Sequence, residues 1–140
     1  MTTPDYANPE VIKRTLAAKT IAVVGLSANP ARPSNEVAVY LQQAGYRVIP
    51  VNPRETSILG ETCYPSLQDI PEPVHMVDVF RNAEAVPPIA KEAVAIGAQS
   101  LWLQLGVISP EGAAIASAGG LDVVMDRCTK IEHARYAHAG

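Results

Sequence analysis

Residues 20–35 have the sequence TIAVVGLSANPARPSN. An apolar run ends at Gly25, and a polar loop stiffened by prolines leads into a helical pattern from Asn35 to Gly45. This order is typical of the first strand, turn and helix of a dinucleotide-type α/β domain. Because a helix start offers unpaired N–H groups and the positive end of a dipole, we expect this turn to hold a phosphate.

The turn departs from the dinucleotide fingerprint G-x-G-x-x-G. A fingerprint that starts at Gly25 needs glycines at 27 and 30, where the chain has Ser27 and Pro30. An NAD site also needs an acidic residue at the end of the second strand to hold the ribose hydroxyls. The predicted second strand is followed by Asn52, and no carboxylate occurs before Glu55. Both features argue against NAD and favour a nucleotide phosphate site of another kind.

The composition is that of an ordinary globular protein. The 140 residues predict one domain, 1–140, with 48% hydrophobic and 18% charged residues. The net charge of −3 and the pI near 5.5 give no indication of a nucleic-acid surface or of binding to an anionic membrane. An anionic ligand must therefore be held by local geometry.

Targeting and redox features are equally plain. Residues 1–5 have neither a basic start nor an apolar signal core, and no run approaches ~18 apolar residues, so we expect a cytoplasmic protein without a membrane segment. Cys63 and Cys128 have no C-x-x-C spacing and are predicted to be two free thiols.

Short β-type runs alternate with helical patterns along the chain. The predicted strands are 21–24, 47–51, 75–80, 100–105 and 121–125. The predicted helices are 8–18, 36–44, 84–96, 110–118 and 130–136. Asn8 and Pro9 suit a helix start, whereas glycines 45, 97 and 119–120 suit left-handed helix ends. Segment 52–73 holds four prolines and is predicted to be a loop with one short turn at 66–69.

The alternation predicts an α/β, Rossmann-like fold of three layers, with an open parallel sheet of about five strands and helices on both faces. Ligands of such sheets bind beyond the carboxyl ends of the strands. The candidate residues there are Gly25, Ser27, Asn29, Arg32, Ser34, Asn35, Asn52, Pro53, Arg54, Phe80, Arg81, Gln104 and Gly106.

Some of these candidates have a second interpretation. Gly25 also fits a tight turn that packing alone requires, and Arg32 and Arg81 also fit ordinary solvated arginines. Two arginines at one rim favour phosphate contact. Ser34 or Asn35 is expected to cap the following helix whether or not an anion binds.

Five segments together carry a resemblance to a known family. They are IAVVGLSANPARPS (21–34), GYRVIPVNP (45–53), GETCYPSL (60–67), VDVFR (77–81) and LWLQLG (101–106). The chain resembles, from about residue 8 to 136, the small stand-alone coenzyme A (CoA)-binding domain proteins. These are similar to the CoA-binding domain of the succinyl-CoA synthetase α subunit and of ADP-forming acetyl-CoA synthetases.

The resemblance implies that the domain binds CoA through its phospho-ADP part, with the pantetheine running outward along the crevice. Gln104 is counted among the CoA-binding residues because of its place after the fourth strand. The pyrophosphate would be cradled by Gly25, Ser27, Ala28, Asn29, Arg32, Pro33, Ser34 and Asn35. The 3′-phosphate and adenine would be bordered by Asn52, Pro53 and Arg54, and the adenine side lined by Phe80, Arg81 and Ala85.

The chain departs from the synthetases at two places. Their turn is richer in glycine than Ser27–Pro30, and their lysine after the second strand has no clear equivalent here. Arg54 is the nearest cation, and Arg32 is positioned to compensate from the turn.

No constellation of catalytic residues is present. The synthetases transfer phosphate through a histidine on a second domain, for which this sequence has no counterpart. His75 opens a buried strand and is interpreted as structural, while His138 is expected to be disordered near the C-terminus. Cys128 and His133 are too few for a metal site, and Cys63 is interpreted as a small buried residue. We therefore predict no catalytic residue and no metal.

The predicted function is non-catalytic binding of CoA or acyl-CoA, as a carrier, sensor or regulatory module. One alternative is a CoA-binding subunit that needs a partner chain for an acyl-CoA synthetase-like reaction. Another is a Rossmann protein for NAD or a further adenine nucleotide. The sequence leaves open the acyl group, the physiological role, and a protein partner or homo-oligomer.

Overall fold

The computed structural model describes residues 5–136. The expected absence of a signal segment rests in part on residues 1–4, and the expected disorder near the C-terminus concerns His138. Both lie outside this range.

Five parallel strands form the central sheet. They are β1 (Thr20–Val24), β2 (Arg47–Val51), β5 (Met76–Val79), β6 (Ser100–Leu103) and β7 (Asp122–Val124), in the order β2-β1-β5-β6-β7. The predicted Rossmann-like α/β fold is confirmed. Three predicted strands extended too far, because Phe80, residues 104–105 and Met125 leave the sheet to form its carboxyl-end loops.

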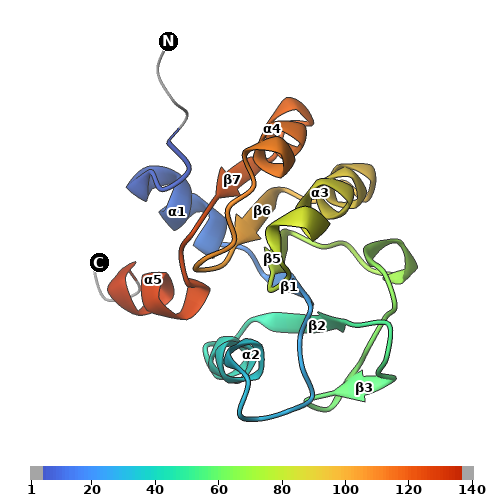
Figure 1. Ribbon diagram of the computed structural model, residues 1–140. Helices are drawn as coiled ribbons and strands as arrows, with labels where there is room; N and C mark the ends of the chain where they lie inside the picture. The colour runs from blue at the N-terminus through green and yellow to red at the C-terminus, as the bar shows by residue number, and fades with distance from the viewer. Residues whose placement is uncertain (1–4, 137–140) are drawn as a thin grey trace.

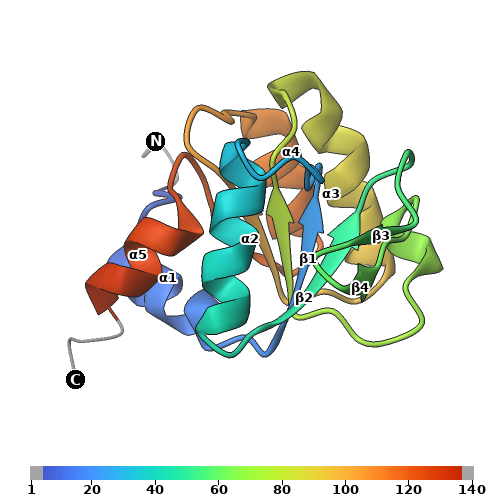
Figure 2. The same ribbon diagram turned by 90° about the horizontal axis from the view of Figure 1, so that it is seen from below.

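Helices cover both faces of the sheet (Figures 1 and 2). One face carries α1 (Pro9–Leu16), α2 (Pro33–Gln43) and α5 (Thr129–Tyr136), and the other carries α3 (Val86–Ala95) and α4 (Pro110–Ala118). Successive residues of β1 alternate between the two cores: Ile21 and Val23 pack under α2, whereas Ala22 and Val24 pack with the residues of α3 and α4. Burial on both faces explains why the strands are continuous apolar runs.

The start of α2 differs from the prediction. The helix begins at Pro33, and Arg32 occupies the cap position without a capping side-chain hydrogen bond, so the prediction of Ser34 or Asn35 as the cap is wrong. Proline suits the first helical position because its missing N–H would have had no partner there. The side chains of Ser34 and Asn35 bond instead to Ser27, seven and eight residues earlier.

Helix α3 also starts later than predicted. A short 3₁₀ turn, η2 (Ala83–Ala85), precedes it, and Asn82 caps that turn by accepting a hydrogen bond from the N–H of Ala85.

The proline-rich segment between β2 and β5 contains a small hairpin that the sequence analysis missed, β3 (Ser57–Ile58) and β4 (Glu61–Thr62). The expected short turn is the 3₁₀ helix η1 (Leu67–Asp69). Tyr64 runs beside Val51 and thereby covers the outer edge of β2. Arg47 ties the segment down through ion pairs with Glu61 and Glu72.

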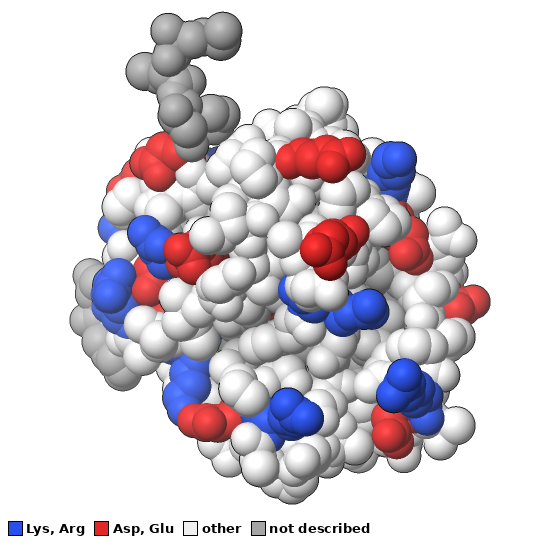
Figure 3. All heavy atoms as spheres, in the orientation of Figure 1, with Lys and Arg blue, Asp and Glu red and all other residues white. Residues whose placement is uncertain are grey.

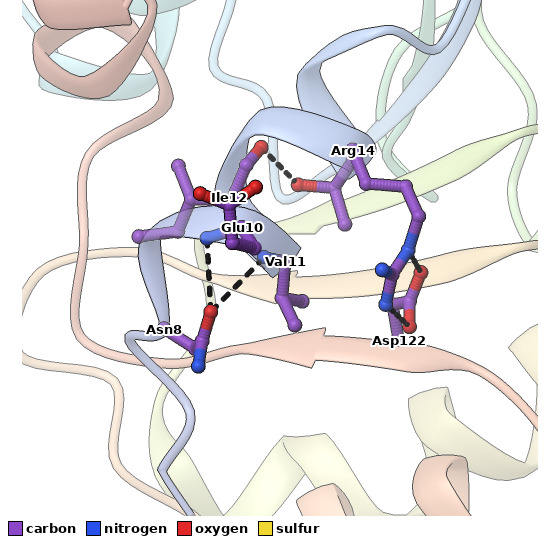
Figure 4. A network of polar contacts seen from close by, with 7 residues as sticks. Asn8, Glu10, Val11, Ile12, Arg14 and Asp122 are labelled. Carbon is purple, nitrogen blue, oxygen red and sulfur yellow. Dashed lines mark hydrogen bonds and ion pairs between the residues drawn. The ribbon is translucent and has the colours of Figure 1, made fainter.

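Helix α1 is fastened at both ends (Figure 4). Oδ1 of Asn8 accepts hydrogen bonds from the N–H groups of Glu10 and Val11, which confirms the predicted cap. Arg14 forms a two-pronged pair with Asp122 at the start of β7, at 2.9 and 2.7 Å. This pair holds the pKa of Asp122 below its usual value and lies at the amino end of the sheet, away from the carboxyl-end crevice.

Candidate functional site

The site lies where the strand order reverses. The chain leaves β1 toward β2 on one side and returns to β5 on the other, so a crevice opens beyond the ends of β1 and β5. Gly25 and Phe80 meet at its base, where the N–H of Phe80 donates to the carbonyl of Val24 at 2.9 Å.

Gly25 has a structural reason to be glycine. Its φ is +88°, and a Cβ at this position would lie 2.4 Å from the carbonyl oxygen of Phe80. Packing of the turn against β5 therefore accounts for this glycine whether or not a ligand approaches it.

Two adjacent cavities lie along the crevice and share Gly25 and Arg81. The first, of about 650 Å³, is called the apolar cavity below; its lining is Gly25, Ser27, Arg32, Pro33, Ser34, Val37, Phe80, Arg81, Asn82, Gln104, Leu105, Val107 and Cys128. The second, of about 490 Å³, is called the polar cavity; its lining is Val24, Gly25, Val51, Asn52, Pro53, Arg54, Pro65, Ser66, Leu67, Arg81, Ile89 and Glu92.

The loop between β1 and α2 is held rigid by its own polar groups. Ser34 Oγ accepts from the N–H of Ser27 at 3.0 Å, and Asn35 Nδ2 donates to the carbonyl of Ser27 at 2.8 Å. Asn29 accepts from the N–H of Ala31. Within residues 5–136, the N–H groups of Ala28 and Ser34 donate to no acceptor. The N–H of Ser34, in the first turn of an eleven-residue helix, thus stays available to an anion at the wall of the apolar cavity, and the N–H of Ala28 stays free in the loop before the helix.

Three arginines surround the crevice. Arg32 lines the apolar cavity, Arg54 lines the polar cavity, and Arg81 lines both. Each is exposed, and none forms an ion pair with a carboxylate within the described residues. Glu92 adds one carboxylate to the lining of the polar cavity. The three guanidinium groups leave the crevice with unneutralised positive charge.

The side chain of Asn52 is engaged in hydrogen bonds to the backbone of the protein. Its Nδ2 donates to the carbonyl of Leu26 at 3.0 Å, and its Oδ1 accepts from the N–H of Arg54 at 2.8 Å. These bonds join the loops after β1 and β2 and hold the backbone of Arg54 at the mouth of the polar cavity. The thiol of Cys63 donates to the carbonyl of Asn52, and burial raises the pKa of this thiol, in agreement with its interpretation as a buried residue.

A buried polar cluster lies under the apolar cavity. Gln104 Nε2 donates to Asp78 Oδ1 at 2.6 Å and to Thr129 Oγ1 at 2.9 Å. The hydroxyl of Thr129 donates to Asp78 Oδ2 at 3.1 Å. Burial raises the pKa of Asp78 to about 7, although both hydrogen-bond partners act to lower it.

The structure brings most of the predicted site residues to the two cavities, but Ala28, Asn29, Asn35, Ala85 and Gly106 line neither. Asn29 and Asn35 shape the loop, and Ala85 ends the 3₁₀ turn before α3. The apolar cavity is also lined by five residues that were not predicted, namely Val37, Asn82, Leu105, Val107 and Cys128. Cys128 follows the fifth strand, so applying the rule of carboxyl ends to that strand would have found it.

His75 and His133 lie outside the crevice. Nδ1 of His75 accepts from the N–H of Thr20, and Nδ1 of His133 bonds to the hydroxyl of Tyr40 at 2.8 Å. In residues 5–136, no three His, Cys, Asp or Glu side chains are placed to hold a metal ion.

The distribution of charge on the surface agrees with the small net charge of −3. Acidic and basic side chains are interspersed over the face that Figure 3 shows. No helix in the described part of the chain is long and apolar enough to cross a membrane.

Comparison with known proteins gives consistent matches. Residues 19–134 match the family model described as CoA binding domain. Over 125 residues the chain is 40% identical to "Uncharacterized protein YneT" of Bacillus subtilis, which covers 89% of this chain and 90% of that protein. A "hypothetical protein from Pyrococcus horikoshii OT3" of known structure is 37% identical, with a TM-score of 0.90 and 96% of each chain covered.

A longer relative is "Acetate--CoA ligase [ADP-forming] II" of Archaeoglobus fulgidus. It is 32% identical over 110 residues, which are 77% of this chain but only 16% of the ligase.

Proposed function

Because the chain belongs to the CoA binding domain family, we propose that it binds CoA or an acyl-CoA without catalysing a reaction, as a carrier, sensor or regulatory module. One observation carries the proposal: two cavities meet at Gly25 and Arg81, beside the open N–H of Ser34 at the start of α2. CoA has the matching sequence of parts, namely a phosphorylated nucleotide, a pyrophosphate and an extended amide-containing arm.

The charges favour one orientation of the ligand. The pyrophosphate would lie at the start of α2 between Arg32 and Arg81, where helix dipole and guanidinium groups act on it together. The adenosine 3′-phosphate would lie near Arg54 in the polar cavity, and the pantetheine arm would extend into the apolar cavity.

CoA is expected to raise the melting temperature, because a ligand that binds only the native state stabilises it by mass action. At a concentration a hundredfold above the dissociation constant the gain in free energy of unfolding is about 2.7 kcal/mol. Differential scanning fluorimetry with CoA and NAD in parallel tests this. A shift with NAD and none with millimolar CoA would contradict the proposal.

Arg54→Ala is expected to weaken CoA binding by about 1–2 kcal/mol, because a charge-assisted contact to the 3′-phosphate is lost. Dephospho-CoA lacks that phosphate and should bind the variant as it binds the wild-type protein. Lys19→Ala is the matched control, since it removes an exposed charge at the amino end of the sheet. Calorimetric titration gives the affinities, and an equal loss for both ligands would remove Arg54 from this role.

The similarity to part of an acetate–CoA ligase supports a second candidate, a binding subunit that works with a separate catalytic chain. Affinity purification of the tagged protein with its bound partners distinguishes the two. A stoichiometric partner with nucleotide-binding activity favours the subunit, and recovery of the protein alone or as a homo-oligomer favours the carrier or sensor.

A further inference from the structure

The amide of Gln104 is oriented by its buried partners. Gln104 follows β6 and is only 4% exposed, yet it lines the apolar cavity. Both hydrogens of Nε2 are used, one by Asp78 and one by Thr129. Within residues 5–136, the other polar atom of the amide, Oε1, accepts no hydrogen bond, and it is not among the fully buried atoms without a partner, so this oxygen is open to the cavity that Gln104 lines.

The charge of Asp78 determines this orientation. A carboxylate only accepts, and it accepts from Nε2 of Gln104 on one oxygen and from the hydroxyl of Thr129 on the other. A reversed amide would place Oε1 against the carboxylate, which is repulsive. Reversal becomes favourable only when Asp78 is protonated and can donate to Oε1. The ionised carboxylate therefore keeps an acceptor, and not a donor, on the cavity side of Gln104.

We propose that Oε1 of Gln104 accepts a hydrogen bond from an amide N–H of the pantetheine arm, and that Asp78 is the positioning residue that turns this oxygen toward the ligand. The inference rests on the proposed function and adds a specificity determinant to it. Pantetheine offers amide N–H donors separated by methylene groups, and the same cavity supplies Val37, Leu105 and Val107 for the apolar parts.

The ionisation of Asp78 falls near neutral pH, because burial raises its pKa to about 7. Its neighbours in register are the apolar Val23 on β1 and Trp102 on β6. The titratable side chains of the adjoining segments are Glu36 and Tyr40 on α2, Asp126, Arg127 and Cys128 before α5, and Lys130, Glu132, His133, Arg135 and Tyr136 on α5. Most of them are engaged with one another: Lys130 with Glu36, Arg135 with Glu132, and His133 with Tyr40.

The test uses the full chain, two probes and the variant Asp78→Asn, which keeps the shape but removes the charge. The probes are CoA and 3′-phospho-ADP, which carries the nucleotide and pyrophosphate without the arm. At about pH 8.5, where Asp78 is ionised, Asp78→Asn is expected to weaken CoA binding about three- to tenfold. It should leave the affinity for 3′-phospho-ADP within about twofold.

The pH profile supplies a readout that a merely structural role would not move. From about pH 5.5 to 8.5 the affinity of the wild-type protein for CoA should rise relative to that of Asp78→Asn, since only the wild type gains the fixed acceptor. The phosphates of CoA change their ionisation in the same way with both proteins, so their effect on affinity cancels in the comparison. Gln104→Met should remove the same arm-specific affinity and its pH dependence.

Equal losses for CoA and 3′-phospho-ADP, or parallel pH profiles of the wild type and Asp78→Asn, would overturn the inference while leaving CoA binding itself in place. Failure of the wild-type protein to bind CoA at all would overturn the proposed function, and this inference with it.

Discussion

Gly25→Ala is expected to lower the free energy of unfolding by about 3 kcal/mol or more. Two costs add up at this position. A Cβ would lie 2.4 Å from the carbonyl oxygen of Phe80, which is backbone and has little room to move, and the φ of +88° is strained for any residue with a side chain. Urea unfolding followed by circular dichroism measures the change.

Gly97→Ala is the matched control, because Gly97 has a similar φ of +76° but open space around its missing Cβ. It should cost only about 1–2 kcal/mol, the conformational part alone. Equal losses in the two variants would contradict the close contact between the β1 turn and Phe80. A bulky substitution at Gly25 is therefore a poor test of ligand approach, since it disturbs the fold first.

Asp78→Asn is expected to make the protein less sensitive to pH in the neutral range. Below about pH 3 the carboxyl is protonated in both the folded and the unfolded chain and costs nothing. As the pH rises to about 7, the folded protein retains the proton that the unfolded chain releases, and the free energy of unfolding falls. The full loss by about pH 8 is on the order of 4 kcal/mol in the wild type and is absent from the variant.

The comparison of the wild type with Asp78→Asn isolates the effect of the Asp78 carboxyl group. The pKa values of Asp122 and Glu72 lie below their usual range, so protonation of these carboxylates lowers the free energy of unfolding toward acid pH. This loss is the same in the wild type and in Asp78→Asn. Chemical unfolding at several pH values gives the two curves. Parallel curves would show that Asp78 does not titrate in this range. At high pH the variant should be the more stable protein, although it loses one acceptor for the hydroxyl of Thr129.

Much of the fold could be predicted, because strands that are buried on both faces are continuous apolar runs in the sequence. The run IAVV in β1 and the run LWL in β6 identify strands by composition alone. Strand ends could not be placed as well, since whether Leu105 pairs or turns outward depends on how far the neighbouring strands extend. The hairpin β3–β4 has strands of two residues each, too short to show any periodicity.

The candidate site likewise has residues that could be predicted from the sequence and residues that could not. Residues that lie one to three positions past the end of a strand, such as Gly25, Arg54 and Arg81, could be named from topology. The missed cap at Arg32 shows the limit: Ser34 and Asn35 are good capping residues, but Ser27 in the preceding loop competes for them. Asp78 escaped notice within an apolar strand, because its bonds reach residues 26 and 51 positions away.

Mapping CoA onto the protein by NMR tests the central claim most directly, since the amide resonances of the ¹⁵N-labelled chain report contact residue by residue. The account predicts that a single titration perturbs the amides of Ala28 and Ser34 together with those near Arg54 and Gln104, while those around Arg14 and Asp122 stay unchanged. Perturbations confined to the amino end of the sheet, or none at millimolar CoA, would contradict the assignment of the crevice as a CoA site.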